Sequence, residues 1–360
     1  MGENTTDRRT DTFLTRDNTM VLKGIAILLM LCHHLWAFPG RVPEELIVGR
    51  PLMVFGDFSK ICVAIFSFLG GYGRFIKYSD RKVNVLTDLR NFYFKYWKVF
   101  VLFIPIAFLF FSHQAPYCQD EKVYACYSGF SVIELILNFL GYLSSYNGEW
   151  WFVSTYLICI CVFPLAKYMV KRFSVIINLF IIILIDVIGM VLDTIGAYDG
   201  SEILKNLFYM KSPYFACFLV GVLFAGGRGF SRVEAKLQGL KFKSVLSAVC
   251  IVLVFAVREI VDNHAFEFIY TAVLIYALKV LLDSIRVLNR PLTFFGRHCT
   301  NMWLTHTFFC YYFGVFVSTL VFLHNPVLVY IALLLYSLAA SFLVDIIWLP
   351  VGKLIQSKKA

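Results

Sequence analysis

Long apolar stretches constrain this chain more than any other feature. They are continuous rather than alternating between apolar and polar residues, a pattern typical of membrane helices and not of membrane β-strands. Apolar residues make up 59% and charged residues 16% of the sequence, against roughly 45–50% and about 25% in soluble globular proteins. We therefore predict an all-α fold, a polytopic membrane helical bundle. The composition excludes a soluble enzyme, a secreted disulfide scaffold and an intrinsically disordered chain.

The apolar stretches predict about ten transmembrane helices. Several are shorter than the roughly 20 residues that a bilayer requires, so their ends must extend into flanking polar sequence. A further apolar segment, 132–146, is short and interrupted by Asn138, Gly141 and Ser144, and we expect it to be interfacial or re-entrant. The ten expected spans are Val21–Trp36, Ile61–Ile76, Val99–Phe111, Trp150–Tyr168, Val175–Leu192, Tyr214–Ala225, Val245–Val257, Phe266–Leu282, Met302–Leu323 and Val327–Leu349.

The basic residues indicate how these spans are oriented. The formal net charge is +10, and most cations cluster in segments that the alternation of spans places on the cytoplasmic side, as the positive-inside rule requires. Both termini are then cytoplasmic. Topology and anionic lipid headgroups account for the charge, so we expect membrane lipids and no nucleic acid as partners. Of the 33 Lys and Arg residues, the seven expected outside are Arg41, Arg50, Lys60, Lys122, Lys205, Lys211 and Arg258.

The same pattern predicts the organisation of the chain. We expect a polar cytoplasmic N-terminal segment at 1–20, one membrane domain at 21–352 and a basic cytoplasmic tail at 353–360. No small-residue cleavage site follows the first apolar stretch, which indicates a retained span rather than a signal peptide. The protein is therefore expected to be a multi-pass protein of a cell membrane.

The ten cysteines divide into two groups. Eight lie in or beside apolar spans, where cysteine is most often a small buried hydrophobic residue. Cys118 and Cys126 both lie in a loop expected outside, in a compartment that can be oxidising. We expect a disulfide between them, with two free thiols as the alternative. No His-x-x-x-His or Cys-x-x-Cys pattern occurs, so no metal site is predicted.

The first span carries the clearest candidate for chemistry. Its sequence from Lys23 to His34 is KGIAILLMLCHH. Because eleven residues at 100° each return to nearly the same helix face, Lys23 and His34 lie on one face, about 16 Å apart along the axis, and His33 points elsewhere. An ionisable group in a span normally faces the protein interior or a wet cavity. The alternative is that Lys23 reaches the headgroups and His34 lies at the outer interface.

Five segments together resemble the acyltransferase 3 family of integral membrane acyltransferases. That family begins with a basic residue, Gly-Ile-Ala, an apolar run and a histidine, as in 23–34, and AIFSFLGGYGR at 64–74 is similar to its second element. In the loop expected after this second element, Lys95 and Lys98 match a basic pair. The segments EWWFVSTYLICICVFPL and FFGRHCTNMWLTH, at 149–165 and 294–306, match two later elements. The resemblance covers essentially the whole chain.

Three departures from the family pattern concern the basic positions. Lys23, Lys95 and Lys98 stand where the family has arginine, and Val101 stands where it has proline. Lysine keeps the positive charge for phosphate groups but loses the planar bidentate geometry of the guanidinium.

The resemblance implies a membrane O-acyltransferase that moves an acyl group, typically acetyl, from cytoplasmic acyl-CoA to a hydroxyl of an extracytoplasmic acceptor. The acceptor is a cell-envelope glycan or a lipid-linked molecule, the membrane is the bacterial cytoplasmic membrane, and acetyl-CoA is a co-substrate rather than a bound cofactor. His34 takes the place of the catalytic histidine, and Lys23, Lys95 and Lys98 take the donor-binding positions. His34 is expected to act as general base, with a covalent acyl-histidine route as the alternative.

Other polar and aromatic residues are candidates to line the same cavity. For His306, the alternative is a structural histidine held by hydrogen bonds, and for Glu149 it is a solvated carboxylate in an aromatic belt. The residues expected to line the cavity are His33, Tyr72, Trp151, His306 and Glu149.

Two other classes of function fit the same sequence. A transporter or flippase for an anionic solute would use the same cations and histidines, and broken helices near the midplane would favour it. A non-catalytic membrane protein that keeps the fold is the other class, which the three lysine substitutions leave open.

Overall fold

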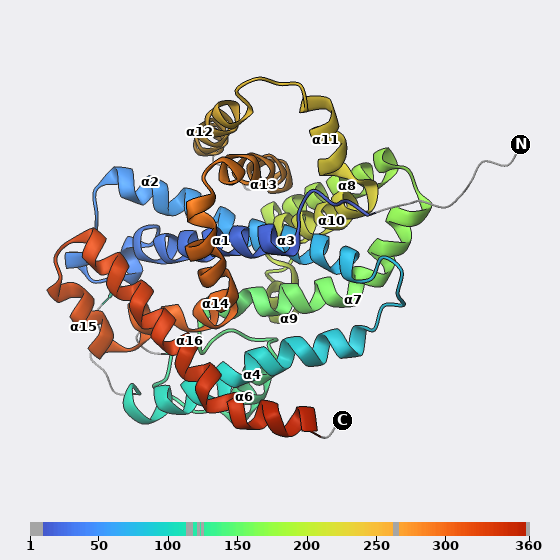
Figure 1. The fold of residues 1–360 in the computed structure, drawn as a ribbon. Coiled ribbons are helices and arrows are strands. Elements are labelled where there is room, and N and C mark those ends of the chain that lie inside the picture. The colour runs from blue at the N-terminus through green and yellow to red at the C-terminus, as the bar shows by residue number, and fades with distance from the viewer. Residues whose placement is uncertain (1–9, 113–117, 121–122, 124–125, 262–265, 358–360) are drawn as a thin grey trace, which may run out of the picture. The chain divides into compact units, whose positions relative to one another are not determined.

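Every regular element described in the computed structural model is a helix (Figure 1). The structure describes residues 10–112, 118–120, 123, 126–261 and 266–357, with only the backbone from 351 to 357. The expected N-terminal segment 1–20 and basic tail 353–360 therefore lie partly outside the described residues. Within the described residues no strand occurs, as the apolar stretches predict.

The contacts of the chain divide it into two compact units that interleave along the sequence. The first unit consists of Met1–Leu22, Val63–Val85 and Thr155–Thr293, and the second of Lys23–Cys62, Leu86–Ser154 and Phe294–Ala360. Because neither unit is a continuous piece of chain, the single membrane domain expected at 21–352 stays a prediction.

Seven helices in the described part of the chain are long and apolar enough to cross a membrane, or up to nine if each of two broken helix pairs is one span. A multi-pass membrane protein is thus supported, while ten spans and the cytoplasmic side of both termini are not confirmed. The seven are Arg16–Trp36, Arg50–Lys77, Val85–Phe110, Gly148–Arg172, Val175–Thr194, Lys243–Val261 and Pro326–Pro350. The two pairs are Glu202–Phe208 with Ser212–Gly227 and Glu267–Ser284 with Arg286–Tyr312.

The first unit is built mainly from helices in the middle of the chain. Helix α10 contacts α8, α11 and α13, and α13 contacts α12. These elements are α3 (Ile61–Lys77), α7 (Trp151–Arg172), α8 (Val175–Thr194), α9 (Glu202–Phe208), α10 (Ser212–Gly227), α11 (Gly229–Leu237), α12 (Lys243–Val261), α13 (Glu267–Ser284) and the 3₁₀ turn η4 (Arg286–Leu288), of which α3 and α7 begin in the second unit.

Two glycines let α3 and α10 approach each other closely. A Cβ atom at Gly71 of α3 would collide with the carbonyl oxygen of Phe218, and one at Gly221 of α10 would collide with that of Phe68. The contact is therefore backbone against backbone, the packing that small residues allow between membrane helices.

A buried aspartate fastens the segment before α1 (Arg16–Trp36) to the start of α11. The Asp11 carboxylate accepts hydrogen bonds from the Phe230 amide at 2.8 Å and the Ser231 hydroxyl at 2.6 Å. The Tyr72 hydroxyl donates to the Asp11 carbonyl oxygen at 3.2 Å. Tyr72, expected to line the cavity, thus belongs to the first unit and holds its N-terminal segment.

The second unit contains the C-terminal part of α1 and the last helices of the chain. Its elements are η1 (Pro39–Arg41), η2 (Glu44–Leu46), α2 (Arg50–Ser59), α4 (Val85–Phe110), α6 (Val132–Phe139), η3 (Gly148–Trp150), α14 (Asn289–Thr307), η5 (Phe308–Tyr312), α15 (Gly314–Phe322) and α16 (Pro326–Ser357), of which α4 and α14 begin in the first unit.

Helix α4 corrects the expectation that Lys95 and Lys98 lie in a loop. The helix already begins at Val85, so both lysines are on one helical face three residues apart.

Helix α6, inside the segment expected to be interfacial or re-entrant, has only eight residues. Its length of about 12 Å is less than half of the hydrocarbon core of a bilayer.

The expected span Met302–Leu323 is interrupted. Helix α14 ends at Thr307, a π-helical turn follows at Phe308–Tyr312, and α15 starts only at Gly314. Phe308 and Phe313 on either side of this turn stack against Phe103 of α4, with ring centroids 5.0 Å and 6.3 Å apart. The interruption places Tyr311 and Tyr312 in a turn that has more residues than a turn of an α-helix.

We predict that Gly71→Ala and Gly221→Ala each destabilise the protein by about 1–3 kcal/mol, because the added methyl group pushes two backbones apart. Thermal unfolding of the purified protein in detergent measures the effect.

Gly73→Ala on the same helix is the matched control, because a Cβ atom there meets no other atom within 4 Å. It should leave the melting temperature unchanged or raise it, since alanine favours the helix by up to about 1 kcal/mol. Equal melting temperatures for all three variants would contradict the close packing of α3 and α10.

Candidate active site

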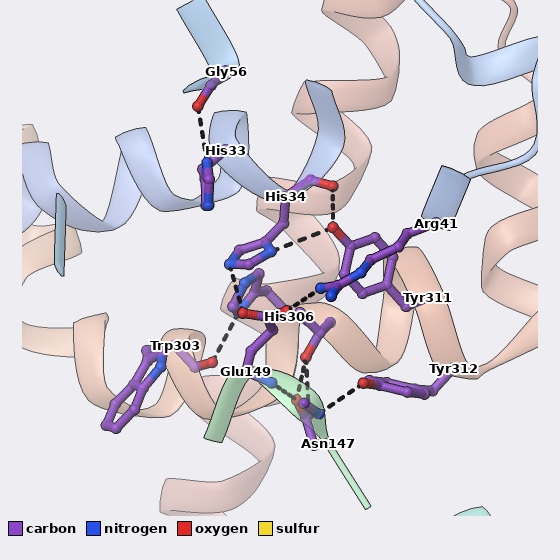
Figure 2. Close-up of polar contacts among 12 residues, drawn as sticks. His33, His34, Arg41, Gly56, Asn147, Glu149, Trp303, His306, Tyr311 and Tyr312 are labelled. Carbon is purple, nitrogen blue, oxygen red and sulfur yellow. Dashed lines mark hydrogen bonds and ion pairs between the residues drawn. The ribbon is translucent and has the colours of Figure 1, made fainter. Parts of the chain in front are cut away.

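His34 lies in the last turn of α1, where the apolar sequence of the helix ends. Its side chain is buried, with 4% of its surface exposed. The Tyr311 hydroxyl donates to the His34 carbonyl oxygen at 2.6 Å, one of the carbonyls that a helix end leaves without an intrahelical partner. The same hydroxyl lies 3.3 Å from His34 Nδ1 (Figure 2).

These two contacts decide which ring nitrogen of His34 carries hydrogen. A tyrosine hydroxyl has one hydrogen, and the hydroxyl of Tyr311 uses it on the His34 carbonyl. In its contact with Tyr311, Nδ1 can then act only as the donor. The other nitrogen, Nε2, faces the carboxylate of Glu149, with 3.5 Å between Nε2 and Oε2. The neutral tautomer that bonds to Tyr311 has its lone pair on Nε2, and the protonated ring donates to both Tyr311 and Glu149.

Glu149 is held by the residues that flank it in the turn η3. The Asn147 side chain accepts from the Glu149 amide at 3.2 Å and exchanges two hydrogen bonds with the Thr307 hydroxyl. The Gly148 amide donates to the Tyr312 hydroxyl at 2.8 Å. The turn that carries Glu149 is thereby fixed to the end of α14 and to η5.

Arg41 supplies the positive charge opposite Glu149. Its Nη1 is 2.7 Å from Glu149 Oε1, its Nε is 3.2 Å from Asp120 Oδ2, and its guanidinium lies 4.6 Å from the centre of the Phe38 ring. Burial lowers the pKa of Arg41, but Glu149, the two tyrosine hydroxyls and Asp120 together outweigh it, so the pKa is raised. Glu149 and Asp120 therefore share Arg41. A proton on His34 would bring the net charge of these four side chains to zero.

The hydrogen-bond partners of His34 suit the protonated ring as well. If Nε2 takes up a proton, both ring nitrogens are donors, and each faces an acceptor: Tyr311 on one side and Glu149 on the other. A carboxylate beside an imidazolium stabilises its charge. The site can therefore accept a proton at Nε2 without rearrangement.

His306, in the last turn of α14, is fully buried beside His34. The two ring centroids are 4.8 Å apart. Its Nδ1 lies 2.8 Å from the Trp303 carbonyl oxygen and 3.2 Å from that of Met302. Both partners are acceptors, so Nδ1 carries hydrogen, and Nε2 has no hydrogen-bond partner among the described residues.

His33 points away from Glu149, toward α2. Its Nδ1 donates to the Gly56 carbonyl oxygen at 2.9 Å (Figure 2). The ring still lies close to His34, with 4.9 Å between the centroids. His33 thus joins α1 to α2 and forms one edge of the histidine cluster.

The structure gives different surroundings to the three expected donor-binding lysines. Lys23 and Lys95 both lie near enough to the Cys299 thiol of α14 to act on it electrostatically. The Lys98 ammonium instead lies 4.7 Å from the centre of the Phe94 ring.

Trp151 and the two loop cysteines are the remaining residues that the sequence singled out. Trp151 packs edge-on against Phe152 with ring centroids 5.7 Å apart, whereas its neighbour Trp150 is buried and donates to the Leu304 carbonyl oxygen. Cys118 and Cys126 are both free thiols in the structure, and a disulfide between them stays a prediction.

A cavity of about 260 Å³ is lined by the two residues that directly follow His34, Leu35 and Trp36. Polar side chains on its wall include Glu45, His324 and Asn325. No group of His, Cys, Asp and Glu in the described part of the chain has the arrangement of a metal site.

Four residues of the site were not predicted from the sequence: Arg41, Asn147, Tyr311 and Tyr312. Arg41 was considered only as a cation outside the membrane, and the two tyrosines belong to the run FFCYYF, which reads as apolar packing. Asn147 carries a local signal, because Asn before Gly-Glu is a typical cap of a short helix.

Comparison with known proteins gives the same family as the sequence segments. The acyltransferase 3 family model, described as an acyltransferase domain, matches residues 20–346. No curated protein and no solved structure matches the chain significantly. Because the match covers nearly the whole chain, including His34, Glu149 and His306, this multi-pass membrane protein belongs to the acyltransferase 3 family.

Proposed function

We propose that the protein is a membrane O-acyltransferase that transfers an acyl group, typically acetyl, from cytoplasmic acyl-CoA to a hydroxyl of an extracytoplasmic acceptor. The acceptor is a cell-envelope glycan or a related lipid-linked molecule, the membrane is the bacterial cytoplasmic membrane, and both chain termini are cytoplasmic. The observation that carries the proposal is the buried His34 ring, whose Nδ1 faces Tyr311 and whose Nε2 faces Glu149.

In the proposed reaction His34 is the general base. The hydroxyl of the acceptor donates to Nε2, and its oxygen attacks the carbonyl carbon of the thioester. The new C–O bond forms as the proton moves to Nε2; the C–S bond then breaks, and the CoA thiolate takes the proton from Nε2, which restores neutral His34. The Glu149 carboxylate stabilises the imidazolium that forms in between. A covalent acyl-histidine on Nε2 is the alternative route.

Lys23 and Lys95 are proposed to bind the phosphate groups of the donor. Lys23 precedes His34 by eleven residues on α1, about 16 Å along the helix axis, a distance comparable to an extended pantetheine arm. The electrostatic contact of both lysines with Cys299 supports a common phosphate-binding region. Donor phosphates at this end would leave the thioester free to reach His34.

The cavity after His34 is the proposed route for the acceptor. It begins at Leu35 and Trp36, directly beside the catalytic residue in the chain. Its aromatic, carboxylate and amide groups are suited to a polar acceptor that also has apolar surface.

The experiment that tests the proposed function measures whether the purified protein consumes labelled acetyl-CoA and whether this consumption depends on His34. Solute uptake into vesicles that is independent of acyl-CoA would favour the transporter instead.

His34→Ala should lower acyl transfer by at least about 10²–10⁴-fold, because general-base assistance of this size is lost. The measurement is transfer of labelled acetyl from acetyl-CoA by purified, folded protein.

His298→Ala is the control, since His298 is another histidine of the second unit, bonded to the Ser341 hydroxyl at 2.9 Å. It should keep transfer within about threefold per folded molecule. Full activity of His34→Ala would remove His34 from the mechanism.

Glu149→Gln should lower kcat by about 10–100-fold and leave the KM for acetyl-CoA unchanged, because the amide cannot stabilise the imidazolium as a carboxylate does. Steady-state kinetics measure both constants.

Asp120→Asn removes the other partner of Arg41 and should lower kcat less than about threefold, since that contact is partly exposed. Equal losses in the two variants would assign the effect to the charge of Arg41 rather than to the contact with His34.

Lys23→Ala and Lys95→Ala should each raise the KM for acetyl-CoA about 5–20-fold with little change in kcat, because each removes one charge from the phosphates. Lys23→Arg should keep the affinity, since arginine also binds phosphate.

Lys205→Ala is the control, as this lysine pairs with Asp199 in the first unit and is expected outside the membrane. Unchanged KM in both alanine variants at low salt would exclude this donor-binding role.

A further inference from the structure

His306 has one ring nitrogen that is satisfied and one that is not. Nδ1 donates to the carbonyl oxygens of Trp303 and Met302 in the preceding turn. The ring is fully buried, and Nε2 has no partner among the described residues. The intact helix turn therefore fixes the tautomer and leaves a basic lone pair on Nε2.

A buried acceptor without a hydrogen-bond partner costs free energy, and such atoms in native proteins require an explanation. Protonation of Nε2 does not remove the cost, because an N–H there would equally lack a partner and would add a buried charge. A purely structural histidine needs only the Nδ1 contacts, which an asparagine could make. The open side of the ring is thus available for a ligand that donates a hydrogen bond.

The position of this lone pair relates it to the proposed reaction. The His306 and His34 rings lie 4.8 Å apart, tilted by 53° (Figure 2). Each ring has its Nδ1 hydrogen held by the protein, so each neutral ring offers Nε2 to a bound molecule. With each O–H···N contact about 2.8 Å long, the 4.8 Å between the ring centroids matches the spacing that hydroxyls on adjacent carbons of one molecule could bridge.

We propose that His306 is a specificity-determining residue whose Nε2 accepts a hydrogen bond from a second hydroxyl of the acyl acceptor, on the carbon next to the acylated one. This inference rests on the proposed function, in which His34 takes the proton of the first hydroxyl. The acceptor is therefore a vicinal diol at the reacting position. A lone alcohol leaves the His306 lone pair buried without a partner.

The experiment compares two probes of nearly equal size, trans-cyclohexane-1,2-diol and trans-2-methoxycyclohexanol, with acetyl-CoA and the purified full-length protein. The methoxy compound keeps one hydroxyl but cannot donate a second hydrogen bond. The wild-type protein should acetylate the diol with a kcat/KM about 10–100-fold higher, because a site built for a hydroxyl rejects the analogue that lacks it. Equal values for the two probes would overturn the inference.

Two variants separate recognition from folding. His306→Asn keeps a donor for the carbonyl oxygens of Met302 and Trp303 and deletes the Nε2 position, so the ratio between the probes should fall below about threefold. His306→Gln keeps a polar group at the Nε2 position and should retain an intermediate ratio. If the ratio persists in both variants, His306 is not the residue that reads the second hydroxyl. The ratio is independent of how much folded protein each variant yields.

A second measurement covers the case in which neither probe is acetylated. The two probes are then compared as inhibitors of the His34-dependent loss of acetyl-CoA, and the diol should inhibit at about 10–100-fold lower concentration, whereas equal inhibition contradicts the inference. The absence of any His34-dependent loss of acetyl-CoA would instead contradict the proposed function. The two failures are therefore distinguishable.

Discussion

The contact between the His34 ring and the Glu149 carboxylate is the interaction on which the candidate site depends. Tyr311 fixes the hydrogen of His34 on Nδ1, and Nε2 then faces Glu149 at 3.5 Å. Arg41 balances the carboxylate, which without a counter-charge would be costly to bury. The rest of the surroundings serve this arrangement: Asn147 and Thr307 hold the turn of Glu149, and the π-helical turn after α14 carries Tyr311 and Tyr312.

The site combines the proposed base, His34, with a second histidine that has a free acceptor atom. A proton gained by His34 would lie beside the Glu149 carboxylate, whereas His306 carries its hydrogen on Nδ1, and its Nε2 has no hydrogen-bond partner among the described residues. Both rings are oriented by backbone or hydroxyl contacts on the Nδ1 side, so their positions do not depend on a substrate. Preorganisation of this kind lowers the cost of reorganising polar groups during a reaction.

Much of the fold could be predicted from the sequence, but not its breaks. Continuous apolar stretches predicted the helices and the membrane character of the chain. The interruption after Thr307 was not predicted, because the run FFCYYF has the hydropathy of a span. Lys95 and Lys98 were expected in a loop, because the charged residues in the first half of α4, which begins at Val85, interrupt the apolar pattern of a span.

The sequence by itself determined the class of protein and the family, and it singled out His34, which we propose as the base. Hydropathy, charge order and motif spacing are local properties, and a helix of known pitch places Lys23 and His34 on one face without further information. Only the tertiary structure decided which groups surround His34. Tyr311 is 277 residues away in the chain and Glu149 is 115 residues away, and no periodicity relates them. Which buried polar groups pair depends on which helix ends meet in the fold. The contact of Arg41 with Glu149, and the His306 Nε2 atom that has no partner among the described residues, therefore became apparent only in the structure.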